Sequence, residues 1–202
     1  MDRDAKLHEL ETLRTRTRQL ETELGSEATS EWPPRGFYGA YAVLAGCVLG
    51  SVAAMASLLF NVVGSLIIGQ FPLQLIRVYL TFPLGAEALQ LESGLALAIG
   101  CCLYLLTGMV FGVPFQWILS RWFDRSGFIV RFIVTTVLGL ALWGVNFHGI
   151  LSWMQPLLIG GSWIVDEIPW WVAMLTHLVF GWAMLLLQPF GRYMTAENKE
   201  AA

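Results

Sequence analysis

Residues 37–70 read FYGAYAVLAGCVLGSVAAMASLLFNVVGSLIIGQ, without a single Asp, Glu, Lys or Arg. A helix rises about 1.5 Å per residue and the hydrocarbon layer of a bilayer is about 30 Å thick, so about 20 apolar residues are enough to cross it. This stretch therefore predicts a membrane-spanning helix that is longer than it needs to be. Such a helix must tilt, protrude from the membrane or break.

Three further stretches share this character, at residues 94–119, 128–151 and 169–190. Only Arg131 brings a charge into the four stretches, and it lies close enough to an end for its long side chain to reach the lipid headgroups. The whole chain is 56% apolar and only 13% charged, against about 25% charged residues in soluble proteins. The sequence predicts an all-α integral membrane protein with four transmembrane helices.

The remaining segments are short and divide the chain simply. Residues 1–36 are expected to form a helical tail and linker, residues 37–190 the transmembrane domain, and residues 191–202 a C-terminal tail. Between the first two spans, residues 72–82 carry a narrow polar stripe on an otherwise apolar helix, which is typical of a helix lying in the membrane interface. No segment is long enough for an independent catalytic domain.

The basic residues predict the orientation, because Lys and Arg beside a span are retained on the cytoplasmic side. In a four-span topology all but one of the 12 basic residues fall on the same side, and Arg77 alone falls on the other. We therefore expect both termini in the cytoplasm, in a bacterial inner membrane. The residues on the predicted cytoplasmic side are Arg3, Lys6, Arg14, Arg16, Arg18, Arg35, Arg121, Arg125, Arg131, Arg192 and Lys199.

The N-terminal tail has the pattern of an amphipathic helix. Its apolar residues Leu10, Leu13, Leu20 and Leu24, with Thr17 between them, follow the three- and four-residue spacing of a heptad seam. Two heptads are marginal as a free dimer in water. The seam faces solvent or the membrane surface, or it docks onto a partner subunit, or it pairs with a second copy that the bilayer holds close.

Small and polar residues inside the spans indicate where helices pack. Gly46 with Gly50, and Gly108 with Gly112, have the GxxxG spacing that allows two helix backbones to approach closely. Asn61 is expected to turn toward neighbouring helices, since an amide in hydrocarbon needs hydrogen-bond partners. It is also the position in the long first stretch where we expect any break.

Two histidines in the predicted spans are the candidate cofactor ligands. His148 lies near the outer end of the third span and His177 about two turns into the fourth, so the two could lie at similar depth. Paired histidines facing each other can bind haem b through both axial positions, and His148 with tryptophans could instead hold a quinone or a lipid headgroup. The simpler alternative is hydrogen bonding within the bundle by His148, Asn146, Thr176 and His177.

The sequence lacks the motifs of the common enzyme classes. It contains no His-Glu-x-x-His, no Gly-x-Ser-x-Gly and no phosphate-binding loop. We expect a non-catalytic structural or assembly subunit of a larger membrane complex, such as an electron-transfer assembly, with no cofactor of its own. The alternatives are a haem b- or quinone-binding membrane protein and a small oligomeric transporter or channel. Lipid and other membrane subunits are the expected partners, and nucleic acid is not.

Overall fold

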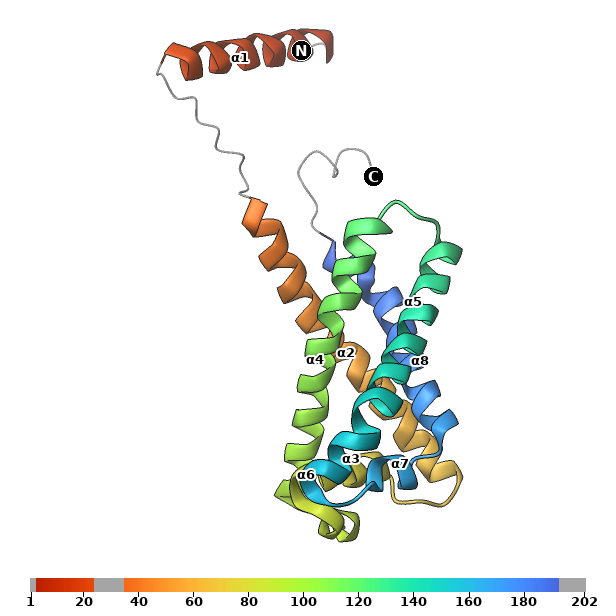
Figure 1. Cartoon of the computed structure of the whole chain (residues 1–202). Helices are drawn as coiled ribbons and strands as arrows, with labels where there is room; N and C mark the ends of the chain where they lie inside the picture. The colour runs from red at the N-terminus through yellow and green to blue at the C-terminus, as the bar shows by residue number, and fades with distance from the viewer. Residues whose placement is uncertain (1–2, 24–34, 193–202) are drawn as a thin grey trace. The chain divides into compact units, whose positions relative to one another are not determined.

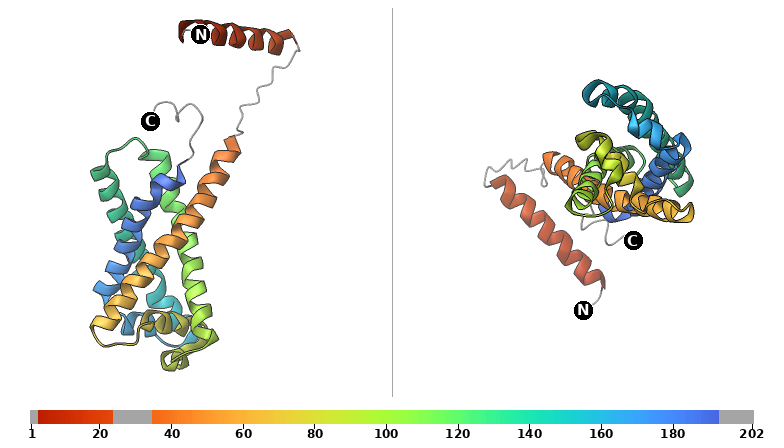
Figure 2. Two further views of the ribbon diagram at one scale, coloured as in Figure 1. Left: turned by 180° about the vertical axis from the view of Figure 1, so that it is seen from behind. Right: turned by 90° about the horizontal axis from the view of Figure 1, so that it is seen from below.

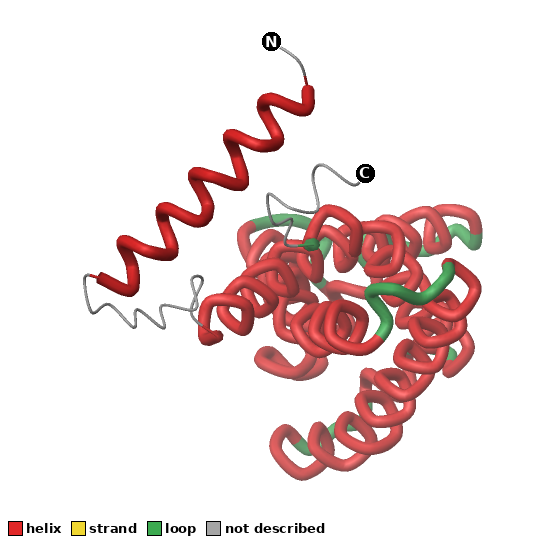
Figure 3. The backbone as a smooth tube through the Cα atoms, turned by 90° about the horizontal axis from the view of Figure 1, so that it is seen from above, coloured by secondary structure: helices red, strands yellow, loops and turns green. Residues whose placement is uncertain are grey.

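The computed structural model describes residues 3–23 and 35–192, and every regular element in these ranges is a helix (Figure 1; Figure 3). Four helical stretches are long and apolar enough to cross a membrane, which confirms the predicted number of spans. They are Tyr38–Ile67, Leu95–Trp122, Phe128–Ile159 and Trp170–Gly191.

Eleven helical elements make up the described chain. They are α1 (Arg3–Glu23), α2 (Arg35–Ile67), α3 (Gln74–Leu84), the 3₁₀ helix η1 (Gly85–Gln90), α4 (Leu95–Trp122), α5 (Phe128–Trp143), the π-helix η2 (Gly144–Leu151), α6 (Ser152–Ile159), α7 (Trp163–Glu167), α8 (Trp170–Leu187) and the 3₁₀ helix η3 (Gln188–Gly191).

Helix α2 is continuous over its 33 residues, so the break considered at Asn61 does not occur. The Asn61 amide donates to the Ser57 carbonyl oxygen at 2.8 Å and to Oγ1 of Thr176 on α8 at 2.9 Å. The side chain is thereby satisfied without disturbing the helix ladder. The helix ends instead at Ile67, and just beyond it Gly69 has a positive φ of 72°, with hydrogen bonds from Gly69 N to Leu66 O and from Gln70 N to Ser65 O. This is the glycine-terminated Schellman arrangement.

The third span extends to Ile159, beyond the predicted end at residue 151. Helix α5 passes into the π-helix η2 and then into α6 without an intervening loop. Gln155 is a polar residue beyond the predicted end of the span, yet it is completely buried. Its polarity therefore does not mark the point where the helix leaves the protein interior. A wider π turn is a recognised local departure within helices and often occurs at functional sites.

The closest backbone approach joins α2 to α4, which cross one another (Figure 2). A Cβ atom built on Gly50 would lie 2.3 Å from the carbonyl oxygen of Gly108, and one built on Gly112 would lie 2.2 Å from that of Gly46. The structure thus brings the two GxxxG pairs against each other within the bundle. Any side chain larger than hydrogen at these positions would push the two backbones apart.

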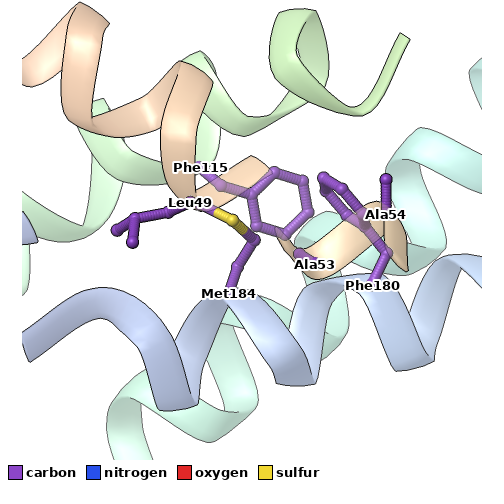
Figure 4. Packing of buried hydrophobic residues seen from close by; sticks show 6 residues of the cluster. All are labelled: Leu49, Ala53, Ala54, Phe115, Phe180 and Met184. Atoms are coloured by element: carbon purple, nitrogen blue, oxygen red, sulfur yellow. The ribbon is translucent and has the colours of Figure 1, made fainter. Parts of the chain in front are cut away.

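An apolar core lies beside this crossing and joins α2, α4 and α8 (Figure 4). The rings of Phe115 and Phe180 meet edge to face, with centroids 5.5 Å apart. Next to them Met184 and Ala53 are completely buried and Ala54 is almost so. Such aromatic pairs contribute about 0.5–1.5 kcal/mol beyond the apolar area that they bury.

Helix α5 pairs closely with α8, again through glycine. A Cβ on Gly181 would lie 2.8 Å from the Thr135 carbonyl oxygen, and a Cβ on Gly139 would lie 3.0 Å from that of His177. Trp182 Nε1 also donates to Thr136 Oγ1 at 3.0 Å. The narrow spacing fixes which residues of α8 face α5.

The short helices α3, α6 and α7 gather at one end of the long helices, here named the α3 end (Figure 1). Gln155 of α6 ties them together, because its amide donates to Thr81 Oγ1 of α3 at 2.8 Å and accepts from the backbone N–H of Ile164 in α7 at 2.9 Å. Thr81, expected on the polar stripe of residues 72–82, is therefore completely buried against the bundle.

Arg77, on the same stripe, lies with its guanidinium 3.5 Å from the centroid of the Phe71 ring, and its Nε donates to the Leu91 carbonyl oxygen.

The opposite end carries the turn between α4 and α5, residues 123–127, and is here named the turn end. Asp124 in this turn forms an ion pair with Arg192 at 2.9 Å. Arg131 donates through Nη1 to Gln188 Oε1 at 2.9 Å. Side-chain contacts thus join the turn and α5 to η3 and to Arg192, which follows it.

Helix α1 forms a unit separate from the body that begins at Ala40. Its described leucines Leu7, Leu10, Leu13 and Leu20 are all exposed. The seam residue Thr17 satisfies its hydroxyl within the helix, by donating to the Leu13 carbonyl oxygen at 3.0 Å. Leu24 and the linker up to residue 34 lie outside the described residues, as do residues 193–202 of the C-terminal tail.

The glycine crossing predicts a strong asymmetry between two substitutions in α2. Gly50→Ala places a methyl group against the α4 backbone, and we expect it to lower the free energy of unfolding by about 1–3 kcal/mol, the usual cost of overpacking. Gly64→Ala is the matched control, since a Cβ there meets nothing within 4 Å. The test is thermal unfolding of both variants in the same detergent. Equal melting temperatures would contradict the crossing.

Candidate functional site

A cavity of about 470 Å³ lies among the helices of the body toward the α3 end. Its walls come from α2, α3, α4, α5, η2, α6, α7 and α8, and it is partly open. Among the residues that line it are Ser57, Tyr79, Leu103, Tyr104, Thr107, Phe111, Leu142, Asn146, Phe147, Met154, Ile164, Thr176, His177 and Phe180. Its size falls within the usual range of small-molecule sites, about 300–1,000 Å³.

The cavity wall is apolar and uncharged. The side chains that line it include no Asp, Glu, Lys or Arg. Leu103 of α4 lines the cavity and is itself 37% exposed. A charged group inside would lose its hydration without gaining a counter-charge, which is costly in an apolar surround. The arrangement therefore suits a neutral molecule.

Two tyrosines form a polar patch on the wall shared by α2, α3 and α4. The Tyr104 hydroxyl lies 2.8 Å from Ser57 Oγ, and the Tyr79 hydroxyl lies 2.5 Å from Thr107 Oγ1. The two rings meet edge to face, with centroids 5.9 Å apart. Sequence reasoning missed both tyrosines. The available signal was a phenol inside or beside an apolar span, because a buried Tyr hydroxyl usually finds a hydrogen-bond partner.

His177 supplies a second polar point on the cavity wall. Its Nδ1 lies 2.7 Å from the Ala173 carbonyl oxygen on the preceding turn of α8. Its Nε2 lies 3.4 Å from Nδ2 of Asn146, which the π-helix η2 places on the same cavity. Thr176 also lines the cavity, and its hydroxyl accepts a hydrogen bond from Asn61, which does not line the cavity. Asn61 therefore positions one part of the wall.

His148 is not brought to this cavity. It is exposed, and its ring meets the rings of Trp143 and Phe147 edge to face, with centroids 5.0 Å and 5.2 Å away. Only His177 of the two histidines lines the cavity. The two histidines therefore do not fit the axial positions of a haem that is held between opposite walls of this cavity. Three of the four residues considered for hydrogen bonding within the bundle, Asn146, Thr176 and His177, do form such bonds.

Three glutamines with no exposed surface are the other polar residues that sequence reasoning missed. Gln116 of α4 donates to the Gly191 carbonyl oxygen at 2.9 Å, while Gln155 and Gln188 make the bonds given above. The signal was present, because an amide in an apolar span needs partners just as Asn61 does. These three residues hold the ends of the helices together rather than line the cavity.

Within residues 3–23 and 35–192, no group of three or more His, Cys, Asp or Glu side chains is placed to hold a metal ion. Comparisons with protein-family models, curated proteins and solved structures find no match to this chain.

Proposed function

We propose that this chain is a membrane-embedded binding protein for a neutral, lipid-soluble molecule, which it holds in the cavity beside His177. The observation that carries the proposal is an uncharged cavity of about 470 Å³ with a few hydrogen-bonding side chains on an apolar wall. Convergent polar groups in an otherwise apolar pocket are the usual form of a small-molecule site. Quinones belong to this class of ligand.

The ligand would reach the cavity from the lipid phase. In support, Leu103 lines the cavity, is partly exposed and belongs to α4, a helix apolar enough to span the membrane. A lipid-soluble molecule concentrated in the bilayer could pass there without crossing water. Ions and charged metabolites find no complementary charge on the wall, which disfavours an ion channel or ion-coupled transporter for this site.

The proposed role is binding, not catalysis. The lining side chains offer hydroxyls, an amide and one imidazole, without a carboxylate to act as a general base or to orient the histidine.

A bulkier side chain at the cavity-lining position Leu103 should abolish binding. We expect Leu103→Trp to reduce photo-cross-linking by a diazirine-bearing benzoquinone at least tenfold in lipid nanodiscs, because the indole occupies the space beside Thr107. Leu106→Trp, one turn along α4, is the control, since Leu106 is 51% exposed and does not line the cavity. Cross-linked peptides are mapped by mass spectrometry. Labels confined to lipid-facing positions, or equal labelling of both variants, would contradict the proposal.

We further propose that the turn end faces the cytoplasm of a bacterial cell, with the α3 end and its short helix α3 in the outer interface. Arg121, Arg125, Arg131 and Arg192 belong to the segments at the turn end, whereas Arg77 belongs to the α3 end. This imbalance follows the rule that basic residues are retained on the cytoplasmic side.

The orientation has a direct test in intact cells. In a background without Cys47, Cys101 and Cys102, we expect a membrane-impermeant maleimide to label Glu167→Cys from outside and to leave Ser126→Cys unlabelled until the cells are lysed. Residue 126 lies in the turn and residue 167 ends α7 at the α3 end. Labelling of residue 126 from outside would reverse the assignment.

A second role is as a subunit of a larger membrane assembly, such as an electron-transfer complex. The specific observation in its favour is the row of exposed leucines on α1, Leu10, Leu13 and Leu20, which a partner helix would cover. The two roles are compatible, because a subunit can also carry a ligand.

Charges placed on the leucine seam should release the chain from such an assembly. We expect Leu10→Glu with Leu13→Glu to shift it, on native gels after mild-detergent extraction, from a large complex to a much smaller species. Thr15→Glu with Gln19→Glu, on the opposite side of α1, should leave migration unchanged. Migration of the unmodified protein as a lone 22.5 kDa chain would rule out the subunit role.

A further inference from the structure

The hydrogen bonding of His177 fixes what its cavity-side nitrogen can do. A carbonyl oxygen only accepts hydrogen bonds, so the 2.7 Å contact with Ala173 requires the proton on Nδ1. No carboxylate lines the cavity to stabilise an imidazolium. In the neutral ring with its proton on Nδ1, Nε2 is a hydrogen-bond acceptor.

Asn146 faces that acceptor with a donor. Its Nδ2 lies 3.4 Å from His177 Nε2, beyond the usual 2.7–3.2 Å range of such bonds. Both residues line the cavity, Asn146 from η2 and His177 from α8. The wall therefore presents a donor and an acceptor that are joined only by a long, weak hydrogen bond. A ligand can replace this bond with little loss of hydrogen-bond energy.

We propose, building on the binding role above, that the ligand is a lipophilic alcohol or phenol whose hydroxyl donates to His177 Nε2 and accepts from Asn146 Nδ2. A hydroxyl fits this pair because it is both donor and acceptor. A ketone or quinone carbonyl only accepts, so it bonds Asn146 but sets one acceptor against another at His177. A hydroxyl-bearing ring is thus favoured over the same ring carrying a carbonyl.

The rest of the cavity suits a flat ring system. Aromatic side chains come from several walls, namely Tyr79, Phe82, Tyr104, Phe111, Phe147 and Phe180. The hydroxyls of Tyr79 and Tyr104 are already engaged with Thr107 and Ser57, so His177 and Asn146 are left as the pair with weakly held hydrogen-bonding capacity. Two sources share this chemistry, a hydroquinone and an alicyclic ring alcohol of the sterol type.

Matched ligand pairs test the inference. The full chain in nanodiscs is cross-linked by the diazirine benzoquinone, and four competitors are titrated by mole fraction in the bilayer: a decyl hydroquinone under anaerobic conditions, its quinone, a sterol-type 3-alcohol and its 3-ketone. We expect the hydroxyl member of at least one pair to compete about tenfold more strongly than its carbonyl partner. Preference within the first pair identifies a hydroquinone, and preference within the second a ring alcohol.

Three variants test whether His177 is the source of the preference for a hydroxyl. His177→Phe keeps an aromatic ring without the acceptor, so the hydroxyl and carbonyl members of each pair should compete about equally. His177→Gln retains an acceptor oxygen and should restore part of the preference for the hydroxyl member. His148→Phe is the matched control and should keep the full ratio, because His148 does not line the cavity. Melting temperatures of all three variants show whether the fold is intact.

The binding role and the preference for a hydroxyl are overturned by different results. Competition that depends on Leu103 but is equal for alcohol and carbonyl, with or without His177, would overturn this inference and leave the binding role standing. Cross-linking that is independent of Leu103 would overturn the binding role itself.

Discussion

The backbone contact between α2 and α4 sets the geometry of the rest of the body. At Gly50 and Gly108 the two helices are so close that no side chain fits between them, and van der Waals contact replaces the hydrophobic drive that lipid does not supply. Helices that touch at a crossing must separate on either side of it. Toward the α3 end the next residues of α2, Ala54 and Ser57, line the cavity together with Gly108 itself. The close contact and the cavity are therefore two results of one crossing.

Hydrogen bonds close the bundle where helix packing alone would leave it loose. An amide has no water to bond in hydrocarbon, so a buried glutamine binds strongly to whatever partner the fold provides. Gln155 does this among the three short helices, and Gln116 and Gln188 do it near the turn end. In the apolar middle of the bundle, glycines set the distance between the long helices. At the polar ends, hydrogen bonds of the amide side chains determine which segments are joined.

The sequence predicted the spans well because lipid imposes one demand on every residue of a span, which is low polarity over a fixed length. The GxxxG spacing pointed to the glycines that meet between α2 and α4, but no such spacing marked Gly139 and Gly181, which meet the backbone across the α5–α8 contact. The sequence could not predict the cavity, since the space left between diverging helices depends on their angles, and no local pattern records these. The histidines illustrate the limit. Their depths could be estimated by counting residues, but the direction of His148 depends on the π-helix that contains it, and it turns away from His177's cavity.

That π-helix makes the third long helix sensitive to its exact number of residues. An α-helix advances by about 100° per residue, because it has 3.6 residues per turn. A π-helix closes its hydrogen bonds over one residue more than an α-helix, so it turns less per residue. Return of residues 144–151 to an ordinary α-helix, with no residue lost, would therefore rotate everything beyond them about the helix axis, and Gln155 would no longer face Thr81 and Ile164. Loss of one residue with the same return would offset much of that rotation, so the length of this segment and its π geometry are matched to each other.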